Sequence, residues 1–242
     1  MRGLPVALRV VACGSAPPPP APDPTGRRTR RRRPSVGGPV PTREYAVSAV
    51  FDLAYRALPP SAARLYRLLG WLPVRTFDAG TAAVAAGVDA ATVTSRLELL
   101  EEASLLQRTD DGRYRFHDLV RLHAGQRAAE EEPESERDAL VARVTTHYLA
   151  LTALADRAVR EDRFRVADLR ELLRDVPDPS PPTLLRRRRI RPLDWLEAER
   201  AAVLAVLRAA VRHGLVRRAW QLAEAFTVLF LHHRHLGSGA SP

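Results

Sequence analysis

Residues 61–116 carry three short helical patterns followed by a hairpin signal, and this order largely decides the fold class. The helical patterns, with apolar residues at three- and four-residue steps, cover residues 61–72, about 78–86 and about 89–103. Pro73 ends the first pattern, Gly87 ends the second, and Asp89 is placed as the N-cap of the third. Asp110-Asp111-Gly112 is a turn signal between two short strands. Three helices and a small β-hairpin in this order are typical of a winged helix.

Helical patterns also flank this module on both sides. Ahead of it, one apolar face is formed by Val47, Val50, Phe51, Ala54 and Leu58, and the pattern ends at Pro59-Pro60. After a joint at Pro133, helices are predicted at about 134–160, near 163–174, at 193–212 and at 215–234. The last two form a predicted antiparallel pair with small residues at close contacts, which are Ala201, Ala205, Ala209, Ala219 and Ala223. Such a pair is typical of the start of a stacked helical repeat.

We therefore predict a mainly α protein with four parts. These are a Pro/Arg-rich tail (1–43), a helix remaining from an upstream domain (44–60), a winged-helix domain (61–132) and a truncated, tetratricopeptide-like helical region (133–242). Because terminal repeats normally carry a polar cap, we expect the open end of the last part to cause self-association or poor solubility.

Residues 1–42 are rich in Pro, Gly and Arg, a composition that cannot build a core, so we predict disorder. Val10–Cys13 loosely resembles a lipoprotein cleavage site, but the apolar stretch that leads to it is short and is interrupted by Arg9, which argues against export. Two other interpretations stay open. A misassigned start or reading frame in a GC-rich gene is one. The other is weak contact with nucleic acid or an acidic partner through Arg27, Arg28, Arg30, Arg31, Arg32 and Arg33.

Residue usage excludes several classes of protein. All 38 Lys+Arg residues are arginine, so the chain alone cannot build a Schiff-base lysine or a P-loop, and we expect no enzymatic activity. The single cysteine, Cys13, excludes an internal disulfide framework. No apolar run approaches the length of a membrane span. A cytoplasmic protein with no membrane partner is expected.

The net charge of +10 suggests a nucleic-acid partner, but its distribution weakens that inference. Residues 1–42 hold eight arginines and one acidic residue, so residues 43–242 carry only +3. The third helix of a DNA-reading winged helix enters the major groove, and here it carries Glu98, Glu101 and Glu102. Because phosphates repel carboxylates, DNA is the less favoured partner of this module.

Phe116, His117 and Asp118 stand between the hairpin and a helix predicted from Leu119 to about Glu131. Two interpretations stay open. In the first, Asp118 is only a helix N-cap and His117 lies at the edge of the core. In the second, His117 donates a hydrogen bond to a nucleotide phosphate, because helix N-termini favour anions.

Three stretches together resemble one known module: YAVSAVFDLAYRALPPSAARLYRLLGWLP, FDAGTAAVAAGVDAATVTSRLELLEEASLL and GRYRFHDLVRLHA. The module is the winged-helix region that follows the ATPase core in the NB-ARC (STAND) signalling ATPases of actinobacteria, many of them regulators of the antibiotic-regulatory-protein type. DWLEAERAAVLAVLRAAVRHGLVRRAWQLAEAF resembles the segment that leads into their tetratricopeptide repeats. The resemblance implies that Phe116-His117-Asp118 matches the family's Met/Phe-His-Asp motif. It implies that His117 touches the β-phosphate of bound ADP and that Asp118 orders the neighbouring loop.

The chain also departs from this family. The P-loop core, which binds ADP or ATP with Mg²⁺ in the family, is expected before residue 44 but has no counterpart in residues 1–42. We therefore expect the non-catalytic regulatory or interaction portion of such a signalling ATPase or transcriptional regulator, with no cofactor of its own. Its expected partners are proteins that contact the helical repeat and a P-loop ATPase domain supplied in trans. The alternative is a DNA-binding transcriptional regulator that uses the winged helix and the Arg-rich tail.

Three charged clusters carry weaker predictions. Arg186, Arg187, Arg188 and Arg189 are expected to form an exposed linker, with an acidic partner or nucleic acid as the other interpretation. His232, His233 and His235 form no expected metal site, because adjacent residues on a helix point apart and no carboxylate or cysteine stands nearby. Glu130-Glu131-Glu132 is predicted to be a solvated helix end.

Overall fold

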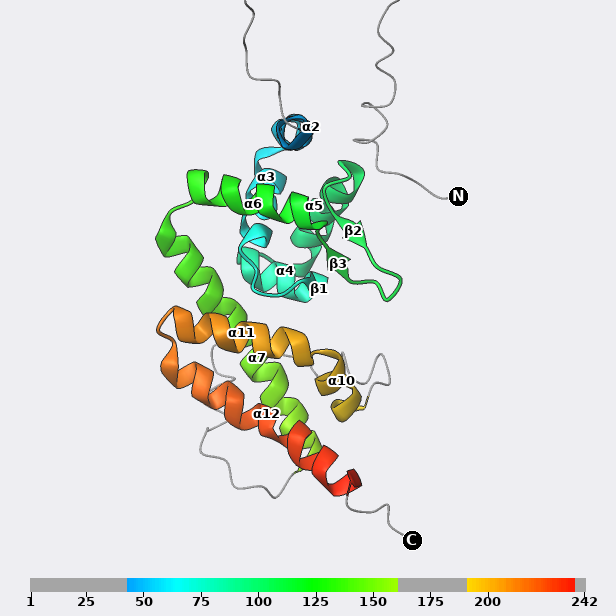
Figure 1. Cartoon of the computed structure of the whole chain (residues 1–242), viewed down its shortest axis with the longest axis vertical. Helices are drawn as coiled ribbons and strands as arrows, with labels where there is room; N and C mark the ends of the chain where they lie inside the picture. Colours follow the sequence, from blue (N-terminus) through cyan, green and yellow to red (C-terminus); the bar gives the residue numbers. More distant parts are fainter. Residues whose placement is uncertain (1–42, 161–190, 238–242) are drawn as a thin grey trace, which may run out of the picture. The chain divides into compact units, whose positions relative to one another are not determined.

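The computed structural model describes residues 43–160 and 191–237, with side chains for 49–160 and 191–231, and these residues are mainly helical (Figure 1). The predicted tail, the predicted helix near 163–174 and Arg186–Arg189 lie outside the described residues. Within the described ranges, no helix is long and apolar enough to span a membrane. The chain divides into two compact units, Met1–Ala57 and Leu58–Pro242.

Helix α2 (Arg43–Arg56) belongs to the first unit. It ends just before Pro59-Pro60, because a proline removes a backbone donor and disfavours a helical conformation in the residue before it. On its predicted apolar face, Phe51 and Ala54 are half-buried, whereas Leu58 lies beyond the end of the helix.

Three helices open the second unit: α3 (Pro60–Gly70), α4 (Ala79–Ala86) and α5 (Ala90–Glu102). The carboxylate of Asp89 accepts hydrogen bonds from the backbone of Ala91 and Thr92, which confirms the predicted N-cap of α5. Gly87 takes a φ of +65° at the end of α4, which confirms the predicted stop and suits glycine. The local breakers in the sequence thus set the helix ends.

A three-stranded antiparallel sheet accompanies these helices, in the order β1 (Thr76–Phe77), β3 (Tyr114–Arg115), β2 (Gln107–Arg108). The predicted hairpin between β2 and β3 is confirmed, with Gly112 at a φ of +79°. The third strand, β1, was not predicted, because two residues are too few to show a period of two. We call residues 58–132 the helix–sheet region.

The C-terminal helical region, residues 133–160 and 191–237, is organised around one long helix. Helix α6 (Asp118–Glu131) leads through Pro133 into α7 (Glu134–Val159), and the described chain resumes with α10 (Pro192–Ala198), α11 (Arg200–Arg212) and α12 (Val216–Gly237). Helix α7 contacts α4 of the helix–sheet region as well as α10, α11 and α12 (Figure 1). The predicted single helix 193–212 is wrong, because it is interrupted at Glu199. The predicted break at His213-Gly214 is confirmed.

The core of the second unit follows the predicted apolar pattern of α3. Leu65, Leu68, Leu69 and Leu72 are each at most 1% exposed. In the α11–α12 pair, Ala209 and Ala219 are buried as predicted, but Ala201 is exposed, so that predicted close contact is wrong. The small residue that matters most for close packing lies elsewhere, at Gly70.

Helices α3 and α6 cross at Gly70. A Cβ atom built at this position would lie 2.6 Å from both the carbonyl carbon of Ala124 and the backbone nitrogen of Gly125. Side-chain atoms do not approach backbone atoms so closely, so only glycine fits here without moving the helices apart. The crossing therefore holds α6 against α3 about two helical turns after residues 116–118, which we call the Phe-His-Asp turn.

Candidate functional site

The Phe-His-Asp turn is anchored in the core by its phenylalanine. Phe116 is 8% exposed, and its ring meets Tyr66 and Phe77 edge-on, with centroid distances of 5.5 and 6.4 Å. Such edge-to-face contacts between buried rings favour one orientation of the chain. Phe116 therefore points inward and positions the two residues that follow it.

His117, not Asp118, occupies the N-cap position of α6. Its φ of −65° and ψ of 146° are extended, and its carbonyl accepts the first helical hydrogen bond, from Arg121 N at 2.9 Å. Its imidazole is exposed and makes no cap hydrogen bond. The predicted Asp118 cap is wrong, because Asp118 is already the first helical residue. Its carboxylate still favours the positive end of the helix dipole.

Two arginines fasten the start of α6 to the segment between α3 and β1. Arg75 donates to the Asp118 carboxylate at 2.8 Å, in a pair that is about four-fifths exposed. Arg121 lies beneath the turn and donates to the carbonyl of Val74 at 2.8 Å and to that of Leu72. Burial, reinforced by the charge of Arg75, lowers the pKa of Arg121. The turn is thus held firmly, while the His117 imidazole stays accessible.

A second polar contact lies one helical turn further along α6. The Tyr66 hydroxyl donates to the carbonyl of Val120 at 3.1 Å and is 2.8 Å from Nδ1 of His123. His123 is 4% exposed. A hydroxyl has one proton, so donation to Val120 leaves His123 Nδ1 as the donor to Tyr66. This contact pins α6 to α3 close to the Gly70 crossing.

The tip of the hairpin is joined to the C-terminal helical region by a buried ion pair. Arg113 follows the turn between β2 and β3 and pairs with Glu199, the residue that interrupts the helix between α10 and α11. The two side chains are 18% and 7% exposed. A further Arg113 nitrogen donates to the Thr76 carbonyl at 3.0 Å, and the Tyr148 hydroxyl of α7 donates to Glu199 at 3.4 Å. One carboxylate thereby connects the hairpin, α7 and the α10–α11 junction.

Protonation in this cluster follows from its burial. Burial alone lowers the pKa of Arg113, but the hydrogen bonds and negative charge of Glu199 outweigh it and raise that pKa above its ordinary value. Burial, reinforced by the charge of Glu199, raises the pKa of Tyr148. Arg113 is therefore charged and Tyr148 neutral at all physiological pH values.

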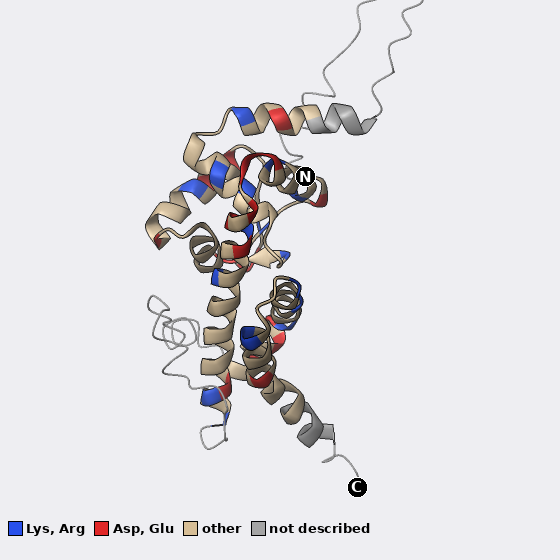
Figure 2. Cartoon of the chain, turned by 90° about the vertical axis from the view of Figure 1, so that its left-hand side faces the viewer, with Lys and Arg blue, Asp and Glu red and all other residues tan. Residues whose placement is uncertain are grey.

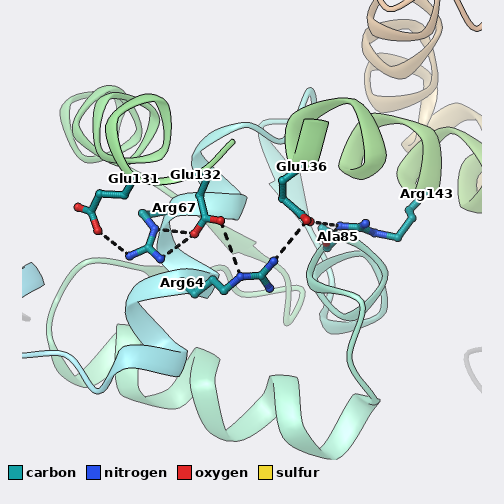
Figure 3. Close-up of polar contacts among 7 residues, drawn as sticks. All are labelled: Arg64, Arg67, Ala85, Glu131, Glu132, Glu136 and Arg143. Atoms are coloured by element: carbon teal, nitrogen blue, oxygen red, sulfur yellow. Dashed lines mark hydrogen bonds and ion pairs between the residues drawn. The ribbon is translucent and has the colours of Figure 1, made fainter. Parts of the chain in front are cut away.

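A second set of ion pairs holds the joint between α6 and α7 (Figure 3). Its members are Arg64, Arg67, Glu131, Glu132, Glu136 and Arg143. Arg67 of α3 contacts Glu132 at 2.7 Å and Glu131 at 3.0 Å. The Glu132 side chain is only 7% exposed, so the predicted solvated helix end is wrong at this residue. Arg64 bridges from Glu132 to Glu136 on the first turn of α7, at 3.8 and 3.4 Å.

The same joint is tied to the end of α4. Arg143 of α7 donates to the carbonyls of Val84 and Ala85 at 3.1 and 2.6 Å, and to Glu136 at 2.8 Å. A cation at the carboxyl end of a helix is favoured by its dipole and satisfies carbonyls that lack a helical partner. Sequence reasoning missed these partners, because nothing local in the sequence marks them.

The surface that a DNA-reading winged helix would present carries mixed charge. Residues 61–132 contain nine arginines and eleven carboxylates, and Figure 2 shows the two signs interspersed there. On α5, Glu98 and Glu102 are exposed. Arg108 of β2 is drawn to Glu101 at 3.6 Å and lies over the Tyr114 ring. Neither α5 nor the hairpin therefore forms a continuous basic face.

The structure does not describe the side chains of the remaining predicted site residues. Arg27–Arg33 and Arg186–Arg189 lie outside the described residues, as do the side chains of His232, His233 and His235. Among the side chains that the structure does describe, no group of three or more His, Cys, Asp or Glu could hold a metal ion.

Comparison with known proteins places the chain beside bacterial regulators. Neither a protein-family model nor a solved structure matches it. It is 37% identical over 185 residues to the regulatory protein AfsR of Streptomyces coelicolor, which covers 74% of this chain and 18% of AfsR. It is 33% identical over 183 residues to AfsR of Streptomyces griseus, which covers 75% of this chain and 18% of that protein. The chain thus spans about a fifth of the length of these relatives, and its similarity to them agrees with the predicted class of actinobacterial regulators.

Proposed function

We propose that this chain is the non-catalytic regulatory portion of a transcriptional regulator, in which a winged helix and the start of a helical repeat move as one lever. The similarity to two AfsR proteins supports a regulatory role. The observation that carries the proposal is the buried pair between Arg113 and Glu199. Because this pair joins the hairpin to the α10–α11 junction, a displacement of the helix–sheet region is passed to the C-terminal helices.

In this proposal the Phe-His-Asp turn is the place where a bound nucleotide acts on the lever, which is the winged helix together with the start of the helical repeat. An exposed imidazole at a helix N-cap, with no hydrogen-bond partner among the described residues, fits a phosphate group. His117 would donate to the β-phosphate of ADP held by a P-loop domain, and Asp118, tied to Arg75, would hold the turn in place. Helix α6 follows directly from the turn and ends at the α6–α7 joint, so a movement of the turn reaches that joint.

The test is a chimaera. The matching segment of Streptomyces coelicolor AfsR is replaced by residues 43–237 of this chain, and AfsR-dependent transcripts are measured in a strain that lacks the native gene. We expect regulation to be retained, to be lost with Arg113→Ala and to survive Arg115→Ala. Arg115 lies two residues further along, on β3, is exposed, and bonds only Gln107 among the described residues. His117→Ala is expected to raise basal transcription. An intact chimaera that fails to regulate would contradict the proposal.

A second candidate function is direct DNA binding by the winged helix and the Arg-rich tail. The similarity to regulatory proteins favours it at least as strongly as it favours nucleotide sensing. The mixed charge of α5 and the engaged Arg113 weigh against it. In the chimaera, loss of regulation with Arg115→Ala but not with Arg113→Ala would favour this candidate.

Deleting residues 1–42 separates the two ways in which the chain would bind DNA. A sequence-specific reader keeps its preference among duplexes without the tail. Binding by the tail alone disappears with it and, in the full chain, falls steeply with salt, because it depends on contacts with phosphates. The measurement is a mobility-shift titration of both proteins on several duplexes at two salt concentrations.

A further inference from the structure

An apolar stripe runs along the exposed side of α12. Val216 and Trp220 are 68% and 50% exposed, and Leu231 is 36% exposed. Together with the exposed Thr227 they repeat at steps of four, seven and four residues, so they share one face of the helix. Scattered apolar residues are normal on a surface, but a stripe along a whole helix marks a binding face more often.

Two further exposed apolar residues lie close in sequence to the ends of this stripe, one on α11 and one on α12. Val211, in the last turn of α11, is 58% exposed and lies just across the short turn from Val216. At the other end Phe230 is 46% exposed, and the Arg200 guanidinium lies 5.8 Å from the centre of its ring. We call these residues, Val211, Val216, Trp220, Phe230 and Leu231, the outer face of the α11–α12 pair.

Charge on these two helices is strongly one-sided. Residues 200–231 contain five arginines and a single carboxylate, Glu224. Arg208, Arg212 and Arg218 are exposed, and none of them forms an ion pair with a residue in the described ranges. In the helix–sheet region, by contrast, Arg67 and Arg113 are both matched by carboxylates. These exposed arginines of α11 and α12 are therefore available for a partner.

We propose that the outer face of the α11–α12 pair binds an acidic amphipathic helix of a protein partner. An amphipathic helix lays apolar side chains at three- and four-residue steps along a matching apolar stripe. Tryptophan and arginine are the residues that most often dominate such interfaces, and Trp220 and the unpaired arginines are exposed on the same two helices. Carboxylates on the partner would satisfy these arginines through charge-assisted hydrogen bonds.

Two other occupants fit these residues less well. A second copy of the chain would bring the same excess of arginine over carboxylate on its own α11 and α12 to the interface, and like charges repel one another. A nucleic acid would gain from the arginines and from stacking on Trp220, but would bury Val216 and Leu231 with no matching apolar surface. An acidic amphipathic helix satisfies both the apolar and the charged residues.

The experiment titrates the full chain into two fluorescein-labelled 18-residue peptides and follows fluorescence anisotropy. Both peptides carry leucine along one helical face; the remaining positions are mostly glutamate in one and mostly lysine in the other. We expect the glutamate peptide to bind at least about tenfold more tightly and to weaken with added salt. Trp220→Ala should weaken it by about tenfold, and the double variant Arg208→Glu, Arg212→Glu should abolish the preference. Leu122→Ala, which removes an exposed leucine from α6, is the matched control and should leave binding unchanged.

Three results would overturn the proposal. Equal affinity for the two peptides would show that the face is merely apolar. Sedimentation that reveals a dimer of the chain, dissociated by Trp220→Ala, would assign the face to a second copy. A labelled DNA duplex that binds more tightly than the glutamate peptide and is lost with Trp220→Ala would assign it to nucleic acid.

Discussion

Replacing Arg113 with alanine is expected to destabilise the whole second unit. Among the residues that the structure describes, the variant leaves the Glu199 side chain, 7% exposed, with the Tyr148 hydroxyl at 3.4 Å as its one remaining polar side-chain partner. Breaking a buried ion pair by removing one partner typically costs about 3–5 kcal/mol. Arg113 is 18% exposed, so water partly replaces it, and we expect about 2–4 kcal/mol of unfolding free energy to be lost. For a domain of this size the melting temperature should fall by about 5–15 °C.

The assay is urea unfolding at pH 7, followed by circular dichroism at 222 nm. Arg115→Ala is the control, because Arg115 lies two residues away, is exposed and contacts Gln107 at 3.3 Å. Its loss should change the unfolding free energy by no more than about 0.5 kcal/mol. The double variant Arg113→Met, Glu199→Leu removes both charges, and it should be more stable than Arg113→Ala, because no buried charge is left without a partner.

The reasoning is refuted if Arg113→Ala and Arg115→Ala are equally stable. It is also refuted if the double variant loses as much unfolding free energy as Arg113→Met alone and Glu199→Leu alone lose when added together. Two residues of one ion pair should not act additively. Hydrogen exchange gives a structural check. If the pair joins the two regions, amides near Arg113 and amides around Glu199 should both exchange faster in Arg113→Ala.

Four further predictions test the packing and the titrating groups. Gly70→Ala should lower the unfolding free energy by about 1–3 kcal/mol, because its Cβ would meet backbone atoms of α6 at 2.6 Å. Gly125→Ala should raise it by about 0.5–1 kcal/mol, since its nearest new contact is an ordinary 3.8 Å, and urea unfolding compares the two. Burial lowers the pKa of His147, so the unfolded chain takes up a proton more readily; stability should fall as the pH drops below about 6.5, and His147→Gln should flatten that fall. The pKa of Tyr148 is raised, so the stability it provides is present below the unfolded value of about 10 and is lost as the pH rises above it; thermal unfolding between pH 8 and 11 should show the loss, and Tyr148→Phe should reduce it.

Local signals in the sequence predicted most helix ends and the hairpin, and long-range contacts explain the errors. Gly87 and Asp89 act through their own backbone and nearest neighbours, so their effects can be read from the sequence. Glu199 looks like an ordinary helical residue, and the helix breaks there where its side chain turns toward Arg113, 86 residues earlier. In the sequence Glu132 looks like part of a solvated helix end, because its partner Arg67 is 65 residues away.

The Phe-His-Asp turn shows the same division. Its position between a strand and a helix could be predicted, because a hairpin signal precedes it and a helical pattern follows it. The sequence could not show that His117, and not Asp118, is the N-cap, because the N-cap is one residue from where propensity alone places it. Nor could the sequence identify Arg75 as the partner of Asp118, 43 residues apart. That His117 remains accessible is a result of packing, not of local pattern.

The ion pairs that individual arginines form matter more for partner binding than the net charge of the chain. Arginine stays protonated even when buried, so each buried guanidinium needs an anion or carbonyls, and Arg113 takes Glu199 and Thr76. A DNA complex that used Arg113 would first have to break that pair, at the cost of about 2–4 kcal/mol estimated above, which lowers affinity by about thirtyfold to a thousandfold. Contacts with partners are therefore expected where exposed arginines lack carboxylates, as at Arg208 and Arg212, and not at Arg113. The basic net charge thus gives no support for DNA reading through Arg113.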